Sequence, residues 1–115
     1  MTPDKIDNNQ VSIVKALRKI PGITVEVGHD DLLLGYKGKT YWFEIKNSDC
    51  VSPKTGEIQP SKIKDSQYKL LRDWRGHYSI VWKLEQILNQ IGDEKLITIY
   101  QWQRLSDKSE NKGGK

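Results

Sequence analysis

The segment from Asp31 to Lys46 reads DLLLGYKGKTYWFEIK, and this pattern predicts a β-hairpin. Two short runs rich in strand-forming residues, Leu32–Leu34 and Tyr41–Phe43, flank a polar turn that contains Gly38. Apart from the polar turn Tyr36–Lys39, two acids and one lysine lie in this largely apolar segment. Charged groups in such surroundings are costly unless they are paired or bind an ion. The hairpin is therefore the first place to look for a functional site.

The length of the hairpin loop decides which acids face each other. A two-residue loop, Lys37–Gly38, places Asp31 directly opposite Glu44, with their Cβ atoms roughly 5 Å apart on one face of the sheet. A three-residue loop, Tyr36–Gly38, would instead place Asp30 opposite Glu44 and turn Asp31 toward the apolar face. We favour the two-residue loop because it keeps the apolar face apolar. Asp30 then becomes a secondary or alternate ligand.

The chemistry of this hairpin favours a hard metal ion. Lys46 follows Glu44 by two residues, so both side chains project from the same face of a strand. The two carboxylates and the backbone carbonyl of Ile45 form an oxygen-rich set suited to Mg²⁺ or Mn²⁺. A neighbouring lysine can orient or help deprotonate a water, or neutralise a phosphate.

His29 is an accessory candidate, as a ligand or a base; the alternative is that it only occupies a turn. The alternative for the whole set is a surface hairpin with an ordinary salt bridge.

Length and composition limit the classes of protein that remain. We expect one domain over residues 1–103 and a polar, disordered tail over residues 104–115 of this 115-residue chain. No run of 18 apolar residues is present, which argues against a membrane span, and the N-terminus lacks the layout of a signal peptide. The single cysteine, Cys50, excludes an internal disulfide and fits a reducing cytoplasm.

The distribution of charge is more informative than the net charge of +4. Between Lys46 and Arg75 there are seven basic residues and four acidic ones. An excess of positive charge next to the hairpin site favours a polyanionic partner such as nucleic acid, although a solvated face explains any single lysine. The candidate contacts are Lys62, Lys64, Lys69 and Arg72.

The remaining pattern predicts an α/β fold. Helical spacing or helix signals extend from Thr2 to the stop at Pro21–Gly22, and again over 61–74 and 84–91. Strands are predicted at 23–27, in the hairpin and at 78–82, a strand or extended arm at 95–102, and a long polar loop at 47–62. Gln10 and Gln67 interrupt apolar helical stripes, so each amide requires a partner. The order α-β-β-β-α-β predicts a mixed sheet flanked by helices.

This ordered set of residues resembles the PD-(D/E)xK nuclease superfamily. Within it, the chain is most similar to the small virus-type replication-repair nuclease (VRR-NUC) domains of bacteriophages. The resemblance spans roughly residues 9–92. The matching segments are Asp31–Gly35, Phe43–Lys46, Gln67, and Trp74–Gly76 leading into the strand Tyr78–Val81.

The resemblance implies a restriction-endonuclease-like core and a Mg²⁺- or Mn²⁺-dependent nuclease. It would hydrolyse phosphodiester bonds of DNA as an endonuclease or exonuclease, with branched or flapped DNA as a possible substrate. Asp31 and Glu44 would bind the metal together with the Ile45 carbonyl. Lys46 would be the catalytic lysine, and Gln67 a site or DNA-contacting residue. A homodimer and a location in the cytoplasm of a host cell are further implications.

Two departures from the family pattern leave alternatives open. Asp30 replaces the usual proline before the first motif, and Asn8–Gln10 stands where the first helix often supplies a glutamate. Gln10 carries no charge, so Asp30 or Glu26 would have to substitute for that glutamate, or metal affinity would be lower. A catalytically weakened nucleic-acid-binding module with the same fold is therefore the second hypothesis. A small phage interaction protein, whose hairpin acids form only a salt bridge, is the third.

Overall fold

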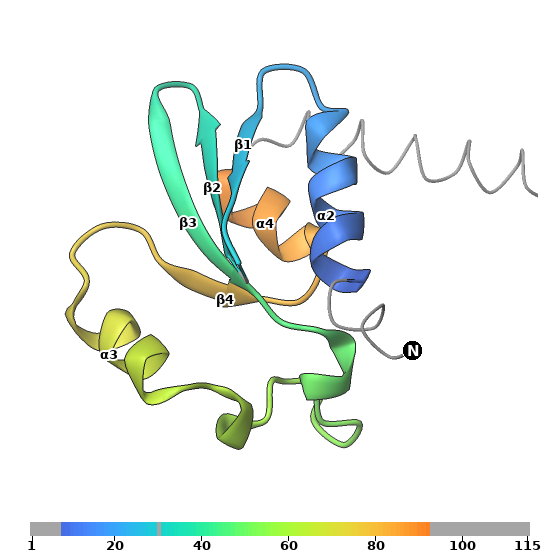
Figure 1. Ribbon diagram of the computed structural model, residues 1–115, viewed down its shortest axis with the longest axis vertical. Coiled ribbons are helices and arrows are strands. Elements are labelled where there is room, and N and C mark those ends of the chain that lie inside the picture. Colours follow the sequence, from blue (N-terminus) through green and yellow to red (C-terminus); the bar gives the residue numbers. More distant parts are fainter. Residues whose placement is uncertain (1–7, 30, 93–115) are drawn as a thin grey trace, which may run out of the picture.

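The structure is a computed structural model, and it describes residues 8–29 and 31–92 of the chain. The described residues form a four-stranded mixed sheet in the order β1-β2-β3-β4 (Figure 1). The strands are β1 (Thr24–Val27), β2 (Asp31–Tyr36), β3 (Lys39–Ile45) and β4 (Ser79–Val81). The helices are α2 (Asn8–Arg18), α3 (Asp65–Asp73) and α4 (Leu84–Ile91), with short 3₁₀ turns η1 (Ser48–Cys50) and η2 (Pro60–Lys62). The α/β order predicted from the sequence is thus confirmed.

The β2–β3 hairpin has the predicted two-residue loop. Tyr36 pairs with Lys39, and Asp31 pairs with Glu44 at the other end of the ladder. Lys37 and Gly38 both have positive φ angles, 52° and 78°, as a type I′ turn requires. This turn matches the right-handed twist of the flanking strands and so holds the register. The alternative with Asp30 opposite Glu44 is excluded.

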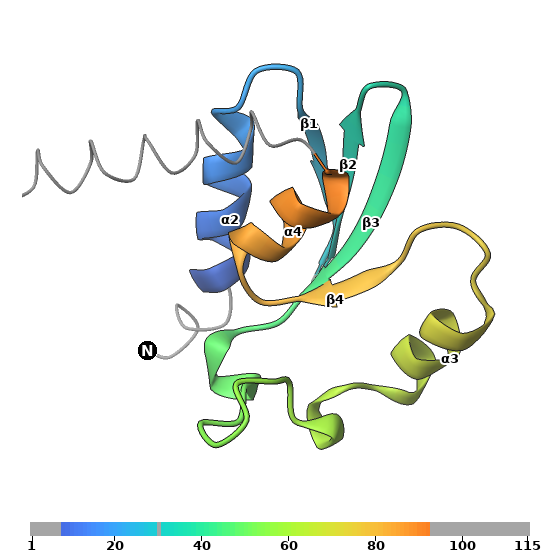
Figure 2. The ribbon, with the colours of Figure 1, turned by 180° about the vertical axis from the view of Figure 1, so that it is seen from behind.

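The hydrophobic core lies on one face of the sheet, where α2 and α4 pack. Both helices lie on this side of the strands in the two views of Figures 1 and 2. Alternate residues of the strands point into the core, including Leu32, Leu34 and Phe43, whereas Leu33 points to the opposite face and is exposed. From the helices, Leu17 and Leu88 are fully buried in the same cluster. One face of the sheet therefore supplies the stability of the fold.

Strand β4 pairs with β3 in parallel after a long excursion that contains η1, η2 and α3. His77, just before β4, contacts both β3 and α4. Its Nδ1 accepts a hydrogen bond from the Trp42 backbone N–H (3.1 Å), so Nε2 carries the proton and donates to Gln90 Oε1 (2.8 Å). The ring also packs edge-on against Phe43, with centroids 4.8 Å apart. These contacts fix the start of β4 against β3 and α4.

The excursion between β3 and β4 has more structure than a loop predicted over 47–62 implies. Besides η1 and η2, an isolated bridge pairs Val51 with Ile58, and the Ser52 N–H bonds the Glu57 carbonyl at 2.8 Å. Helix α3 begins at Asp65, four residues later than predicted, because Lys64 is extended (φ −75°, ψ 156°). In both views α3 stands apart from α2 and α4 (Figures 1 and 2).

Several predictions concern residues outside those that the structure describes: the helix start at Thr2, the element at 95–102 and the tail at 104–115. Over the described ranges 8–29 and 31–92, no helix is long and apolar enough to cross a membrane.

Candidate functional site

Asp31 and Glu44 form a cross-strand pair on the face of the sheet opposite the core. The Asp31 carbonyl accepts a hydrogen bond from the Gly28 N–H at 2.8 Å, so the backbone groups of Asp31 point toward β1 and away from β3. Asp31 and Glu44 are therefore a non-hydrogen-bonded pair, the closer of the two antiparallel arrangements, with Cα atoms about 4.5 Å apart. Two carboxylates are thus held side by side on a rigid hairpin.

The Asp31 carboxylate is oriented by its neighbours. The Trp42 indole Nε1 donates a hydrogen bond to Asp31 Oδ2 at 2.8 Å. The other oxygen, Oδ1, lies over Gly28, where a Cβ atom would collide with it. Gly28 thus provides the space that the carboxylate occupies. Partners of this kind fix the direction of a carboxylate without binding a ligand themselves.

Gln10 and Asn9, at the start of α2, bind the backbone of the strands that carry the acids. Gln10 Nε2 donates to the Asp31 carbonyl at 3.1 Å, so its amide contacts the main chain of the site and not a carboxylate. Asn9 Nδ2 donates to the carbonyls of Lys46 (2.5 Å) and Trp82 (2.9 Å). Gln10, an accessory candidate in the sequence, therefore positions the backbone of Asp31. Asn9 positions the backbone of Lys46 and Trp82 in the same way, and the sequence analysis does not identify it.

The segment Glu44–Lys46 ends β3 at the same place. Glu44 is buried, with 7% of its surface exposed, and Lys46 is half-buried. The Lys46 N–H bonds the Val81 carbonyl at 2.9 Å, so the backbone groups of Lys46 point toward β4. Because backbone direction alternates along a strand, the carbonyl of Ile45 points toward the β2 side, where Asp31 is the first strand residue. The backbone oxygen predicted as a ligand lies on the side of the acid pair.

Tyr78 joins this face from the segment before β4. Its ring packs edge-on against Trp42 with centroids 4.9 Å apart, and Trp74 contacts Trp42 from another direction at 5.4 Å. Burial, together with the negative charges of Glu44 and Asp31, raises the pKa of Tyr78 to about 12. The alternation of the strand predicted at 78–82 could have placed Tyr78 on one of the two faces, but not beside the acids.

Three predicted site residues have different outcomes. Gln67 is buried, with 6% of its surface exposed, and its Oε1 accepts a hydrogen bond from the Lys64 N–H at 3.0 Å. This contact caps α3, and a role for Gln67 in the site stays a prediction. His29 is exposed in the turn between β1 and β2, and Asp30 lies outside the described residues. Within residues 8–29 and 31–92, no group of three or more His, Cys, Asp or Glu side chains could hold a metal ion.

The basic residues predicted to contact nucleic acid are exposed around the start of α3 and along it. They are Lys62, Lys64, Lys69 and Arg72. Arg72 binds Asp73 through two hydrogen bonds, Nε to Oδ1 at 2.8 Å and Nη2 to Oδ2 at 3.1 Å. Its charge is thus partly compensated, and the three lysines are the stronger candidates for phosphate contacts.

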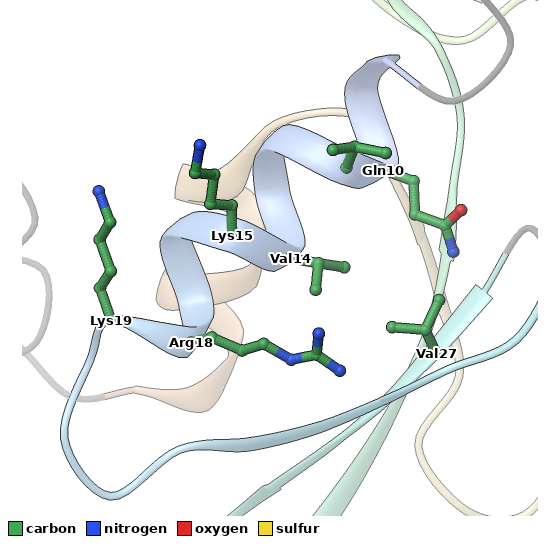
Figure 3. A pocket seen from close by; sticks show the side chains of 7 residues that line it. Gln10, Val14, Lys15, Arg18, Lys19 and Val27 are labelled. Atoms are coloured by element: carbon green, nitrogen blue, oxygen red, sulfur yellow. The ribbon is translucent and has the colours of Figure 1, made fainter. Parts of the chain in front are cut away.

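A separate pocket of about 520 Å³ lies between α2 and β1. Figure 3 shows Gln10 and Arg18 extending toward β1, whereas Lys15 and Lys19 point away from it. Arg18 Nη2 donates to the Val25 carbonyl at 3.2 Å, which satisfies an outward-facing group of the strand. The acid pair does not line this pocket, so we locate the candidate site on the hairpin.

Comparison of the chain with protein-family models, with curated proteins and with solved structures finds no match. The class of the fold, an α/β arrangement with a four-stranded mixed sheet flanked by helices, therefore comes from the structure itself.

Proposed function

We propose that this protein is a Mg²⁺- or Mn²⁺-dependent nuclease that hydrolyses phosphodiester bonds of DNA, built on a restriction-endonuclease-like core. The observation that supports it best is the cross-strand pair Asp31 and Glu44, with Lys46 following on the same face. Cleavage of branched or flapped DNA is part of the proposal, since it follows from the resemblance to VRR-NUC domains.

The residues present fit a divalent cation. Asp31 and Glu44 are adjacent like charges, Glu44 is buried, and both acids raise the pKa of Tyr78. Like charges held together in partly buried surroundings are unfavourable unless a cation compensates them. Two carboxylates and the carbonyl of Ile45 would hold Mg²⁺, which commonly keeps several waters beside one or two carboxylates. When bound, such a cation lowers the pKa of a bound water and polarises a phosphate oxygen.

The chain's own residues have distinct roles in this proposal. Lys46 orients the nucleophilic water or neutralises the charge that develops on the phosphate in the transition state. Trp42 and Gly28 keep the Asp31 carboxylate in one direction. The exposed lysines near α3 bind the DNA backbone by charge, without reading sequence.

A second candidate is a module that binds nucleic acid without cutting it. The described residues offer two acids but no third His, Cys, Asp or Glu beside them. Asn9 and Gln10, in the region where the family often supplies a glutamate, use their amides on backbone carbonyls. A site with fewer charged ligands binds its cation more weakly, and this favours binding over catalysis.

Homodimer formation, which the resemblance implies, is also part of the proposal. Tyr68, Leu71 and Trp74 are exposed along α3 and at its end, each with more than two fifths of its surface accessible. Exposed apolar groups that gather on one helix are suited to an interface. Sedimentation equilibrium of the full chain distinguishes a monomer from a dimer.

The decisive experiment measures cleavage of linear, flapped and four-way DNA in Mg²⁺ and in Mn²⁺. Wild-type protein is compared with Glu44→Gln and Lys46→Ala, and with Glu57→Gln and Lys39→Ala as controls. The control residues carry the same charges but are exposed and lie outside the acid pair.

We expect metal-dependent cleavage that both site substitutions reduce by at least about 100-fold and that both controls retain. Cleavage that survives the site substitutions would reject the assignment of the site. DNA binding without cleavage by any of the proteins would favour the non-catalytic module.

A further inference from the structure

The pocket of about 520 Å³ between α2 and β1 has apolar walls. Val11 and Val14 line it from the helix and Val27 from the strand, and Figure 3 shows Val14 and Val27 facing each other across it. Val14 is buried, whereas Val11 and Val27 keep 57% and 46% of their surface exposed. Small-molecule sites are concave, mostly apolar and roughly 300–1,000 Å³ in volume. The pocket thus offers accessible apolar surface on two walls to a ligand of that size.

The charged side chains that line this pocket, among residues 8–29 and 31–92, are all basic. They are Lys15, Arg18 and Lys19, which lie in the second half of α2 and just after its end. All three are exposed. Three positive charges beside one pocket attract an anion to it and disfavour a cation. The charge of the pocket therefore complements an anionic group on a ligand.

Arg18 is the cation directed into the pocket. Figure 3 shows its guanidinium extending toward β1, whereas Lys15 and Lys19 point away from the strand. Its Nη2 donates to the Val25 carbonyl at 3.2 Å, and this contact holds the guanidinium at the strand. A guanidinium has five N–H donors in a planar fork, so it can keep that bond and also bind a carboxylate. The anion-binding group is thus oriented before a ligand arrives.

The order of residues along α2 sets the length of a ligand that fits. Val11, Val14 and Arg18 follow one another at helical spacing, so they share one face of the helix. A rise of about 1.5 Å per residue separates Val11 from Arg18 by about 10 Å along the helix axis. An apolar chain of this length can contact the valines while its anionic end reaches the guanidinium.

We propose that this pocket binds an amphipathic monocarboxylate. Its aliphatic body packs against Val11, Val14 and Val27, and its carboxylate accepts hydrogen bonds from Arg18. Hydrogen bonds between charged groups are the stronger ones, and apolar burial adds to them. The acid pair of the hairpin does not line the pocket, so this proposal is independent of the nuclease.

The test titrates the full ¹⁵N-labelled chain with octanoate and follows amide chemical shifts by NMR. Octanol carries the same chain without the charge, and acetate carries the charge without the chain. We expect octanoate to shift amides of α2 and β1, and both comparison ligands to bind at least about 10-fold more weakly. The same titration at higher salt should give a larger Kd for octanoate, because exposed charges are screened.

Two substitutions and two matched controls locate the site. Arg18→Gln removes the guanidinium, and Val11→Glu places an acid on the apolar wall; each should raise the Kd of octanoate by about 10-fold or more. Lys54→Gln and Ser12→Glu make the same changes of charge at exposed positions that do not line the pocket, and they should leave the Kd unchanged. Thermal melting of all four variants establishes that they are folded.

Three results would overturn the proposal. Octanol might bind as tightly as octanoate, which would leave no role for the cations. Folded Arg18→Gln and Val11→Glu with wild-type affinity would place any octanoate elsewhere on the surface. Binding to phosphatidylglycerol vesicles without binding of octanoate would make the basic end of α2 a membrane contact and not a ligand site.

Discussion

The two faces of the sheet are made by alternating residues of the same strands, and neighbouring leucines show how much they differ. Leu34 is fully buried in the cluster formed with α2 and α4, whereas Leu33 is 45% exposed on the face of the acid pair. The core face is closely packed with apolar side chains. The other face combines two adjacent acids, a lysine and the hydroxyl of Tyr78, which is buried and has no hydrogen-bond partner within residues 8–29 and 31–92.

The core face is the face whose packing stabilises the fold. Adjacent carboxylates and an unpaired buried hydroxyl each make the free protein less stable than an apolar replacement would. Such departures from good packing are expected where a protein binds or reacts with something else. The cluster buried on the core face is formed by apolar side chains.

The largest effect should come from truncating the core face. We expect Leu34→Ala to lower the free energy of unfolding by about 2–5 kcal/mol, because it leaves a cavity in packed surroundings. Leu33→Ala, one residue away, should change it by within about 0.5 kcal/mol. Urea denaturation followed by circular dichroism measures both. Equal losses would show that α3 or another partner covers the acid face as fully as α2 and α4 cover the core.

A smaller effect, confined to the acid face, is expected from Gly28→Ala. The new Cβ would collide with Asp31 Oδ1, and the flexible carboxylate would turn away to relieve the clash. Metal affinity should therefore fall by about 10-fold or more, with little change in thermal stability. Calorimetric titration with Mn²⁺ measures the affinity.

The matched control for this substitution is Gly35→Ala on the same strand pair, where the added Cβ meets only the hydroxyl of Thr24. It should leave Mn²⁺ binding unchanged. Wild-type affinity in Gly28→Ala would mean that the direction of the Asp31 carboxylate does not matter for the metal.

The smallest effect should appear at alkaline pH. Burial and the charges of Glu44 and Asp31 raise the pKa of Tyr78 to about 12, above its usual value of about 10. Between these values the unfolded chain has lost the tyrosine proton and the folded protein retains it, so stability falls as pH rises. Below about pH 10 the stability that the raised pKa of Tyr78 contributes is fully present. Urea midpoints from pH 9 to 12 should decline less steeply in Tyr78→Phe than in the wild type. Identical declines would contradict the raised pKa.

Local patterns explain why much of the fold could be predicted. The hairpin register follows from a short turn with Gly38 and from apolar alternation, both readable within sixteen residues. Helix α4 has the predicted bounds because its apolar spacing is strong and Gly92 ends it in the left-handed conformation. Helix α3 begins later than the predicted start at Ser61, because the extended backbone at Lys64 has no clear signal in the sequence.

The contacts that build the site were harder to predict, because they join segments far apart in the chain. Asn9 binds the Lys46 carbonyl across 37 positions, and the Trp42 N–H binds His77 across 35. The alternation of β3 places Trp42 on the face of Glu44, but the sequence alone does not assign its indole to Asp31. The alternation of strands gives the face of a side chain, whereas its partner depends on tertiary packing.

The parallel pairing of β3 with β4 has a consequence for how such a protein can diverge. The chain leaves the sheet after Ile45 and returns at Ser79, and the basic surface and α3 lie entirely within that excursion. The entropy of closing a loop grows only slowly with its length, by about 0.6 kcal/mol for each doubling. Insertions or replacements in the excursion can therefore accumulate without disturbing the hairpin. A change in the length of this excursion would leave the hairpin and its acid pair in place.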